Sequence, residues 1–239
     1  MSELLDLVVE SHGGLDRWDR LTEITAHVAI GGLLWERKGH GGILADTHVT
    51  LDLHRERLGY RPFDAPGRRS LFEPARTVIE GDDGRVLAER DDPRAAFAGH
   101  RPETPWDELH VVYFSGYAMW NYLTAPFLFT RPGFVVEEVE PWSQNGQTWR
   151  RLRVEYPDAI ATHSRVQEFY FDESGLLRRH DYTAEVVGGV PAAHLSEGHR
   201  TVDGITFPTR RRVFSRQPDG QIVPGPAAVS IDVLDISVR

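Results

Sequence analysis

The sequence of 239 residues contains no cysteine, and lysine occurs only once, at Lys38. The absence of cysteine excludes disulfides, thiolate metal sites, a cysteine nucleophile and acylation of a lipobox cysteine. All other basic side chains except histidine are arginine, a bias that we attribute to genomic base composition. The formal net charge is -9. Because phosphate binding requires a basic surface, we expect neither nucleic acid nor an anionic membrane as a partner.

The N-terminus lacks the basic residues that begin a secretory signal peptide. Residues 1–14 carry acidic side chains instead, and polar residues interrupt their apolar run. The sequence therefore predicts a cytoplasmic location. No linker, low-complexity tract or repeat of about 20–50 residues divides the chain, so residues 1–239 are predicted to form a single domain.

Charged residues are also missing from one long internal stretch. Residues 109–130 contain no Asp, Glu, Lys or Arg in a chain that is 26% charged. Residues 104–107 (Thr-Pro-Trp-Asp) combine a hydroxyl N-cap, a proline at the first helical position and a carboxylate in the first turn. Residues 125–126 (Ala-Pro) mark an end. These signals predict a central helix over residues 105–124 that is apolar enough to bury both faces.

A weakly polar stretch of this length also reaches the usual threshold for a membrane-spanning helix. His110, Asn121 and Pro126 interrupt it, and the remaining segments have the pattern of strands in water-soluble proteins. We therefore favour a buried helix inside a β-rich shell and predict no stable membrane insertion.

The segments on both sides of this helix show the two-residue alternation of strands. Residues 22–90 predict a first group of strands, one of them running through residues 35–38, after two short amphipathic helices within residues 2–21. Residues 135–238 predict a meander of seven strands with tight turns, the first at residues 144–146. The expected fold is mainly β with helices. It is a single strongly curved antiparallel sheet, a half-barrel, wrapped around the long buried helix.

Three motifs of the meander connect this pattern to a known family. They are Trp-Arg-Arg-Leu-Arg-Val at residues 149–154, Gln-Glu-Phe-Tyr-Phe-Asp at residues 167–172 and Gly-Leu-Leu-Arg-Arg-His at residues 175–180. With the order of helix, strands, helical insert and further strands, they resemble the lipoprotein-carrier family of LolA and LolB. The resemblance implies an open, bent sheet that helices close over an apolar cavity. Those carriers are periplasmic or lipid-anchored, so lipoprotein sorting itself is not expected here.

One stripe of the central helix carries hydrogen-bonding groups, because winding at about 100° per residue brings ring hydroxyls, an imidazole and an amide together. Such groups beside apolar rings suit an enclosed ligand site, and imidazole and phenol can exchange protons near neutral pH. The candidate ligand-binding residues are Trp106, Tyr113, Trp120, Asn121 and, on a later strand, Tyr182. The candidate catalytic residues are His110, Tyr117 and His180. The alternative is that all are core residues with locally bonded polar atoms.

His180 is a candidate because it shares one face of a predicted strand with Tyr182, while Asp181 points to the other side. If that face is concave, it opposes the helix and can bring His180 to His110 and Tyr117. The alternative is a strand face that meets water, as antiparallel sheets commonly have.

No set of histidines is predicted to bind a metal ion. His48 lies too far along its strand from Asp52 and His54 to share one ion with them. His194 and His199 are separated by an odd number of residues and should face opposite sides of their strand. No metal and no cofactor is therefore expected.

Two further motifs have simple structural interpretations. Thr-His-Ser at residues 162–164 lacks the sharp elbow and oxyanion hole of a serine nucleophile and is interpreted as a strand entrance. Arg-Arg-Arg at residues 210–212 alternates between the faces of a strand, which favours a surface ion network over an anion site.

Three classes of function remain open, and the oligomeric state is not predicted. The first is a protein whose apolar and aromatic cavity binds a small hydrophobic or acyl-type molecule. The second is a cofactor-independent enzyme, such as a cyclase, isomerase or hydrolase of a polyketide-like or acyl substrate, which uses histidine and tyrosine in that cavity. The third is a structural module with a filled core.

Overall fold

The computed structural model describes residues 2–144 and 146–239. Its helices are α1 (Glu3–Ser11), α2 (Leu15–Trp18), α3 (Leu33–Arg37) and α4 (Glu108–Thr124), with the short 3-10 helices η1 (Ala95–Phe97), η2 (Phe127–Thr130) and η3 (Glu185–Val187). The strands before α4 are β1 (Glu23–Gly31), β2 (Thr47–Asp52), β3 (Arg57–Arg61), β4 (Arg68–Glu73), β5 (Arg76–Gly81) and β6 (Val86–Asp91). The strands after α4 are β7 (Val135–Gln144), β8 (Gln147–Glu155), β9 (Val166–Phe171), β10 (Leu177–Ala184), β11 (Val190–Val202), β12 (Ile205–Ser215) and β13 (Val229–Val238).

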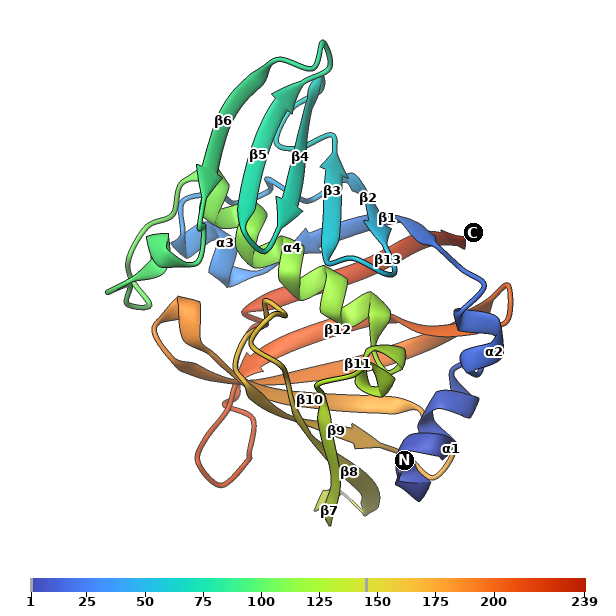
Figure 1. Ribbon diagram of the computed structural model, residues 1–239. Coiled ribbons are helices and arrows are strands. Elements are labelled where there is room, and N and C mark those ends of the chain that lie inside the picture. The colour runs from blue at the N-terminus through green and yellow to red at the C-terminus, as the bar shows by residue number, and fades with distance from the viewer. Residues whose placement is uncertain (1, 145) are drawn as a thin grey trace.

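These strands form one antiparallel sheet of thirteen (Figure 1). Strands that are adjacent in the chain are adjacent in the sheet on either side of one seam, where β1 pairs with β13. Strands β6 and β7 are the two edges, so the sheet is open. The predicted half-barrel with a long helix against it is confirmed. The turn expected at residues 144–146 includes Asn145, which lies outside the described residues.

Helix α4 lies across the inner side of this sheet. Figure 1 shows strands β3 to β6 rising on one side of the helix and strands β10 to β12 passing beneath it. The helix packs most closely on β3, β4 and β5. A Cβ atom added at Gly116 would lie 2.4 Å from Cβ of Phe72, so the absence of a side chain permits this close approach. The Tyr60 hydroxyl donates to the carbonyl of Ser115 at 3.1 Å.

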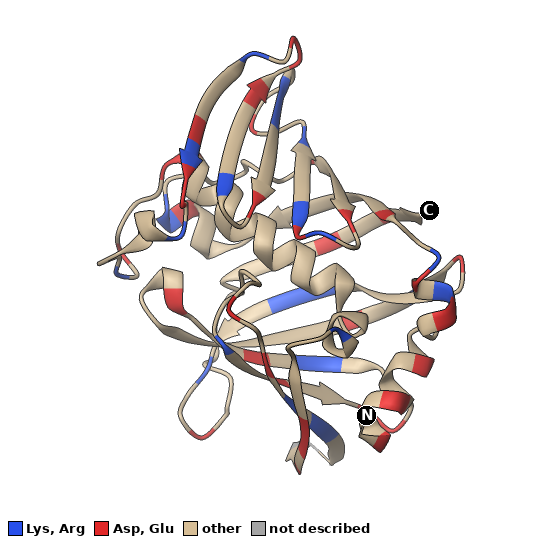
Figure 2. Ribbon diagram, in the orientation of Figure 1, with Lys and Arg blue, Asp and Glu red and all other residues tan. Residues whose placement is uncertain are grey.

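Burial of α4 on all sides agrees with the prediction from its uncharged sequence. Every residue from Leu109 to Thr124 is buried. In Figure 2 the helix carries no charged residue beyond its first turn, whereas β12 beneath it has a basic segment. No helix among the described residues is long and apolar enough to span a bilayer.

The start of α4 differs from the prediction. The N-cap is Asp107 rather than Thr104, and its carboxylate accepts from the backbone N–H of His110 at 3.0 Å. The His110 ring accepts from the backbone N–H of Asp107 at 3.2 Å, which completes a reciprocal cap. Thr104 instead closes an earlier turn through the N–H of Arg101. Two sites could cap the helix, and the carboxylate nearer the apolar run is the one that does so.

One prediction for the N-terminal strands was wrong. Residues 35–38 lie in and after helix α3 instead of a strand, because Gly32 at φ 110° turns the chain and Trp35 is buried against Trp106 and Phe114. The two short helices expected within residues 2–21 are present as α1 and α2.

Candidate functional site

His163, in the loop between β8 and β9, is a buried polar side chain that contacts both α4 and β10. Its Nδ1 lies 3.0 Å from the hydroxyl of Tyr117, and its Nε2 lies 2.7 Å from the hydroxyl of Tyr122. Its ring stacks on Tyr182 with centroids 3.9 Å apart. The hydroxyls of Tyr122 and Tyr182 are 3.1 Å apart. We call these four residues the His163 cluster.

The loop that carries His163 is fixed on both sides by hydrogen bonds. The side-chain amide of Asn121 on α4 donates to the carbonyl of Ala161 at 2.9 Å. The N–H of Ala161 in turn donates to the buried carboxyl group of Glu56 at 2.9 Å. One residue later, the Gln167 amide donates to the Thr162 hydroxyl at 2.6 Å. The position of His163 is therefore determined by α4, the turn after β2 and strand β9 together.

The inner faces of β10, β11 and β12 continue this polar region. His180 stacks on Phe169 with centroids 4.0 Å apart, and its Nε2 is 2.6 Å from the side-chain oxygen of Gln167. His194 pairs in register with His180. Neither ring nitrogen of His194 has a hydrogen-bond partner among the described residues. Beside it, the Arg211 guanidinium donates to the carbonyl of Tyr122 at 2.8 Å.

Burial keeps the histidines of this region neutral. Desolvation, followed by the charge of Arg94, lowers the pKa of His163 to about 3. Desolvation is also the main reason why the pKa values of His180 and His194 lie well below the usual range, and nearby positive charge is a smaller cause. Desolvation likewise raises the pKa values of the three phenols in the His163 cluster. An effective general base has a pKa near the working pH, so these groups are suited to holding a polar atom rather than to shuttling protons.

The predicted helix stripe is divided between different surroundings. Tyr117 belongs to the His163 cluster together with the strand residue Tyr182, and Asn121 holds the loop beside it. His110 caps the start of α4, where its Nδ1 lies 2.7 Å from Asp107. His110 has no contact with His180, so the predicted meeting of His110, Tyr117 and His180 does not occur among the described contacts.

The other stripe residues contact separate parts of the shell. Trp106 packs against Trp35 and Phe97, and Tyr113 packs against Phe72 and Phe97. Trp120 donates its indole N–H to the carbonyl of Asp52 at 2.8 Å.

Sequence reasoning missed the residue at the centre of the cluster. His163 was interpreted as part of a strand entrance, and no local signal marks it, because its two phenolic partners are 46 and 41 residues away.

Arg211 was assigned to a surface ion network. Its neighbours Arg210 and Arg212 do pair with Glu197 and Asp232, but Arg211 points inward. The alternation of the strand already placed the middle arginine on the opposite face.

An apolar pocket of about 100 Å³ reaches the His163 cluster from the side of α3. Its wall is formed mainly by apolar side chains of α4 and strands β10 to β13: Phe114, Tyr182, Ala184, Ala192, Val213 and Val229. Arg37 and Ser215 add polar groups to the lining. A second pocket, of about 340 Å³, is lined by residues 156–162 of the His163 loop and by Tyr113, Arg94 and Glu185.

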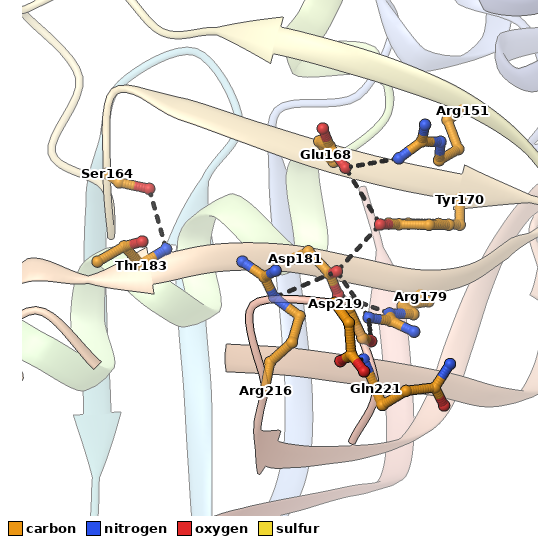
Figure 3. Close-up of polar contacts among 11 residues, drawn as sticks. Arg151, Ser164, Glu168, Tyr170, Arg179, Asp181, Thr183, Arg216, Asp219 and Gln221 are labelled. Atoms are coloured by element: carbon orange, nitrogen blue, oxygen red, sulfur yellow. Dashed lines mark hydrogen bonds and ion pairs between the residues drawn. The ribbon is translucent and has the colours of Figure 1, made fainter. Parts of the chain in front are cut away.

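On the faces of β9 and β10 that point away from α4, several charged side chains form an ion network (Figure 3). The carboxylate of Asp181 pairs with Nε of Arg179 at 2.6 Å and with Nε of Arg216 at 3.3 Å. It also accepts from the Tyr170 hydroxyl at 3.0 Å. Arg179 reaches the carbonyl of Gly220 as well, which fastens the loop between β12 and β13 to the sheet. As predicted, Asp181 points away from His180, and it is shared by two arginines.

The strand histidines are dispersed. His48 stacks on His27 with centroids 4.6 Å apart. The ring of His199 instead lies near that of His12. Among residues 2–144 and 146–239, no group of three or more His, Asp or Glu side chains is arranged to hold a metal ion.

Comparison with known proteins gives the fold. No family model matches the sequence, and no curated protein matches it. A Vibrio parahaemolyticus domain named as an outer membrane lipoprotein-sorting protein superposes with a TM-score of 0.56 at 10% identity, covering 98% of this chain and 92% of that one. A LolA superfamily protein from Nitrosomonas europaea superposes with a TM-score of 0.53 at 10% identity, covering 97% and 92%. The chain therefore has the LolA-like fold that its sequence motifs predicted.

Proposed function

We propose that this protein binds a small hydrophobic molecule in the pocket between α3, α4 and strands β10 to β13. The observation that carries the proposal is the apolar lining of that pocket beside the hydroxyl groups of the His163 cluster. Ligand sites commonly combine an apolar wall with a few convergent polar groups. The LolA-like fold supports the proposal, because one of the similar structures is named for lipoprotein sorting.

The size of the pocket limits the ligand. Typical sites for drug-sized ligands measure about 300–1,000 Å³, whereas this one measures about 100 Å³. We therefore expect a compact apolar body, or a longer one that enters as the flanking segments move apart. Most of α4 is packed against the shell, as the filled-core hypothesis expects, and the pocket beside Phe114 is the exception on which binding depends.

Catalysis by His110, Tyr117 and His180 is not part of the proposal. His110 and His180 lie in different surroundings, and the depressed pKa of His180 makes it a poor base at neutral pH.

A cytoplasmic location does form part of the proposal. Cell fractionation followed by immunoblotting tests it, and recovery of the protein in the periplasmic or membrane fraction would contradict it.

Calorimetric titration with straight-chain alcohols of four to ten carbons tests binding directly. We expect affinity to rise with each added methylene until the chain outgrows the pocket. The variant Ala228→Trp places a large ring at a pocket-lining position on the approach to β13 and should abolish binding. Leu234→Trp, at a side chain that is 51% exposed on β13, serves as the matched control. Absence of binding by every alcohol, or equal binding by Ala228→Trp, would refute the proposal.

A native mass spectrum provides an independent measurement. Purified protein that retains a hydrophobic molecule should show a mass above that of the chain. Ala228→Trp should lack this extra mass, and Leu234→Trp should keep it.

A further inference from the structure

Arg211 on β12 is a buried cation with incomplete compensation. Its side chain is 2% exposed. Among the described residues, Arg211 forms no ion pair with a carboxylate, in contrast to the paired Arg210 and Arg212 on either side. One terminal nitrogen donates to the Tyr122 carbonyl at 2.8 Å and the other to the Ser196 hydroxyl at 3.3 Å. Its Nε has no acceptor among the described residues.

The hydrogen bond from Arg211 to the Tyr122 carbonyl has a structural role, but it neutralises only part of the guanidinium charge. The last four carbonyls of a helix lack intrahelical partners, and the carbonyl of Tyr122 is one of these in α4. A helix C-terminus carries about half an elementary negative charge. The guanidinium therefore stabilises the end of α4 but remains only partly neutralised. Removing a charged group from water costs several kcal/mol unless it is paired, so an anion at this position would be strongly favoured.

His194 supplies a second unused donor next to this cation. Strand β11 pairs with β12 so that His194 lies opposite Val213 and Ser196 lies opposite Arg211. The ring of His194 packs edge-on against Tyr122 with centroids 4.5 Å apart. Its side chain is fully buried, and neither ring nitrogen finds a partner in the described part of the chain. A neutral imidazole has one N–H donor. Buried polar groups without partners are rare enough to require an explanation.

The register connects these donors to the apolar pocket. Val213, which lines the pocket, is opposite His194 and two residues from Arg211 on the same strand. Two residues of a strand span about 7 Å. Ala192, also in the lining, is two residues from His194. A molecule in the pocket thus needs to extend only a short distance along the inner face to reach both donors.

From this arrangement we propose that Arg211 and His194 form a carboxylate-binding subsite at the inner end of the pocket. The ligand is a monocarboxylic acid with a compact apolar body. Its carboxylate accepts from Nε–H of Arg211 and from the N–H of His194, and its apolar body lies against Ala192 and Val213. A single buried cation favours a monoanion, since a dianion would leave an unmatched negative charge. This inference rests on the proposed function and specifies the class of ligand.

Binding requires a movement of side chains, because neither Arg211 nor His194 is among the residues that line the pocket. Rotation of the His194 ring breaks no hydrogen bond among the described contacts. The ligand then enters the pocket with its carboxylate first. The polar end of the ligand meets the unused donors, and the apolar end stays toward the mouth.

Calorimetric titration of matched pairs tests the inference at pH 7. The pairs are alkanoates and primary alcohols of the same chain length, from four to ten carbons. We expect the wild-type protein to bind the acid at least tenfold more tightly than the alcohol. Arg211→Met should lower the affinity for the acid at least tenfold and change the affinity for the alcohol less than threefold. Arg211→Lys should restore part of the preference. Arg210→Met, on the exposed face of the same strand, should keep the full preference.

Several outcomes separate the two proposals. If the wild-type protein binds neither acid nor alcohol, the proposed function fails. If it binds both with equal affinity, or if Arg211→Met weakens both equally, the pocket stands and the carboxylate subsite is refuted. Should Arg211→Met not fold, His194→Phe provides the second variant, because it keeps an aromatic ring and removes the donor. It should reduce the preference for the acid by about threefold or more, and an unchanged preference would remove His194 from the subsite.

Discussion

The hydroxyl of Tyr122 lies 2.7 Å from Nε2 of His163 and joins the last turn of α4 to the loop between β8 and β9. Tyr117 contacts the other nitrogen of the same ring at 3.0 Å. Because a neutral imidazole has one N–H and one lone pair, one phenol must accept from His163 while the other donates to it. The tautomer of the ring therefore sets the direction of the hydrogen bonds through the whole cluster.

Replacing His163 with Phe tests this bridge. The ring volume is kept, but the Tyr117 hydroxyl is left buried without a partner, so we expect a loss of about 1–3 kcal/mol in the free energy of unfolding. Urea denaturation measures the loss. Adding Tyr117→Phe should recover most of it, because the unpaired hydroxyl is then absent. His48→Phe, at an exposed position, is the control and should change stability by less than about 0.5 kcal/mol. A failure of the double variant to recover stability would contradict the bridge.

The neutral buried histidines predict a loss of stability in acid. The folded pKa values of His163, His180 and His194 lie below the unfolded value of about 6.5. The unfolded chain therefore binds more protons, and stability present above pH 6.5 falls as the pH drops toward the folded values. His163, with a folded pKa of about 3, should contribute a loss of about 2 kcal/mol between pH 7 and pH 5, and His180 and His194 should add losses of the same sign. Urea denaturation across this range measures the slope.

A variant isolates the part of the slope that belongs to one ring. His163→Phe should reduce the pH dependence by about one histidine's share, whereas His48→Phe should leave it unchanged. A stability that stays constant between pH 7 and pH 5 would mean that these rings become protonated without unfolding.

Glu56 should act in the opposite direction. Desolvation raises the pKa of its carboxyl group to about 8, although the N–H of Ala161 counteracts part of this rise. The folded pKa is above the unfolded one, so the associated stability is complete below about pH 4.5 and is lost as the pH rises to about 8. Glu56→Gln should therefore be more stable than the wild-type protein at pH 8, by about 2–4 kcal/mol, and similar to it near pH 4.5. Thermal unfolding at several pH values measures this crossover.

Glu173→Gln is the matched control for Glu56, since Glu173 is exposed in the turn after β9. It should not change the pH dependence. If Glu56→Gln lowers stability equally at both pH values, the carboxyl group is ionised and paired in the folded protein.

Gly116 should not tolerate alanine, even though alanine is the better helix former. The added Cβ would lie 2.4 Å from both Cβ and Cγ of Phe72 on β4, so α4 and the sheet would have to separate. We expect a loss of about 1–3 kcal/mol instead of a gain. Phe72→Gly is expected to destabilise the protein by itself, but because it removes both Cβ and Cγ it should remove most of the additional penalty of Gly116→Ala. A double-mutant cycle by urea denaturation measures this coupling, and strictly additive losses would argue against the contact.

Much of the fold could be predicted because its signals are local. The alternation and turns of residues 135–238 define β7 to β13 within a few residues, and the absence of charge in residues 109–130 identifies α4. The failures arose where local signals compete. Thr104 and Asp107 both suit an N-cap, and the segment around Trp35 has a strand-like composition but is turned into a helix by Gly32.

The candidate site was less predictable, because its contacts join distant segments. Tyr117, Asn121 and Tyr182 were selected from residue type and periodicity, and the structure places them in or beside the His163 cluster. His163 could not be identified from the sequence, because its role depends on the packing of the loop before β9 against α4. The inward direction of Arg211 followed from strand alternation, but its lack of a carboxylate partner depends on which residues the opposite elements supply.

The seam between β1 and β13 has a consequence for how the chain reaches its native state. Strands β1 to β6 and β7 to β13 are two runs of nearest-neighbour hairpins, and only the pairing of the earliest strand with the latest makes them one sheet. During synthesis, the pairing of β1 with β13 cannot form until β13 leaves the ribosome, about two hundred residues after β1. Contacts of such long sequence separation slow folding. Until the seam closes, β1 presents an unpaired edge to other chains, so its vulnerability to misassembly is set by the time needed to complete translation.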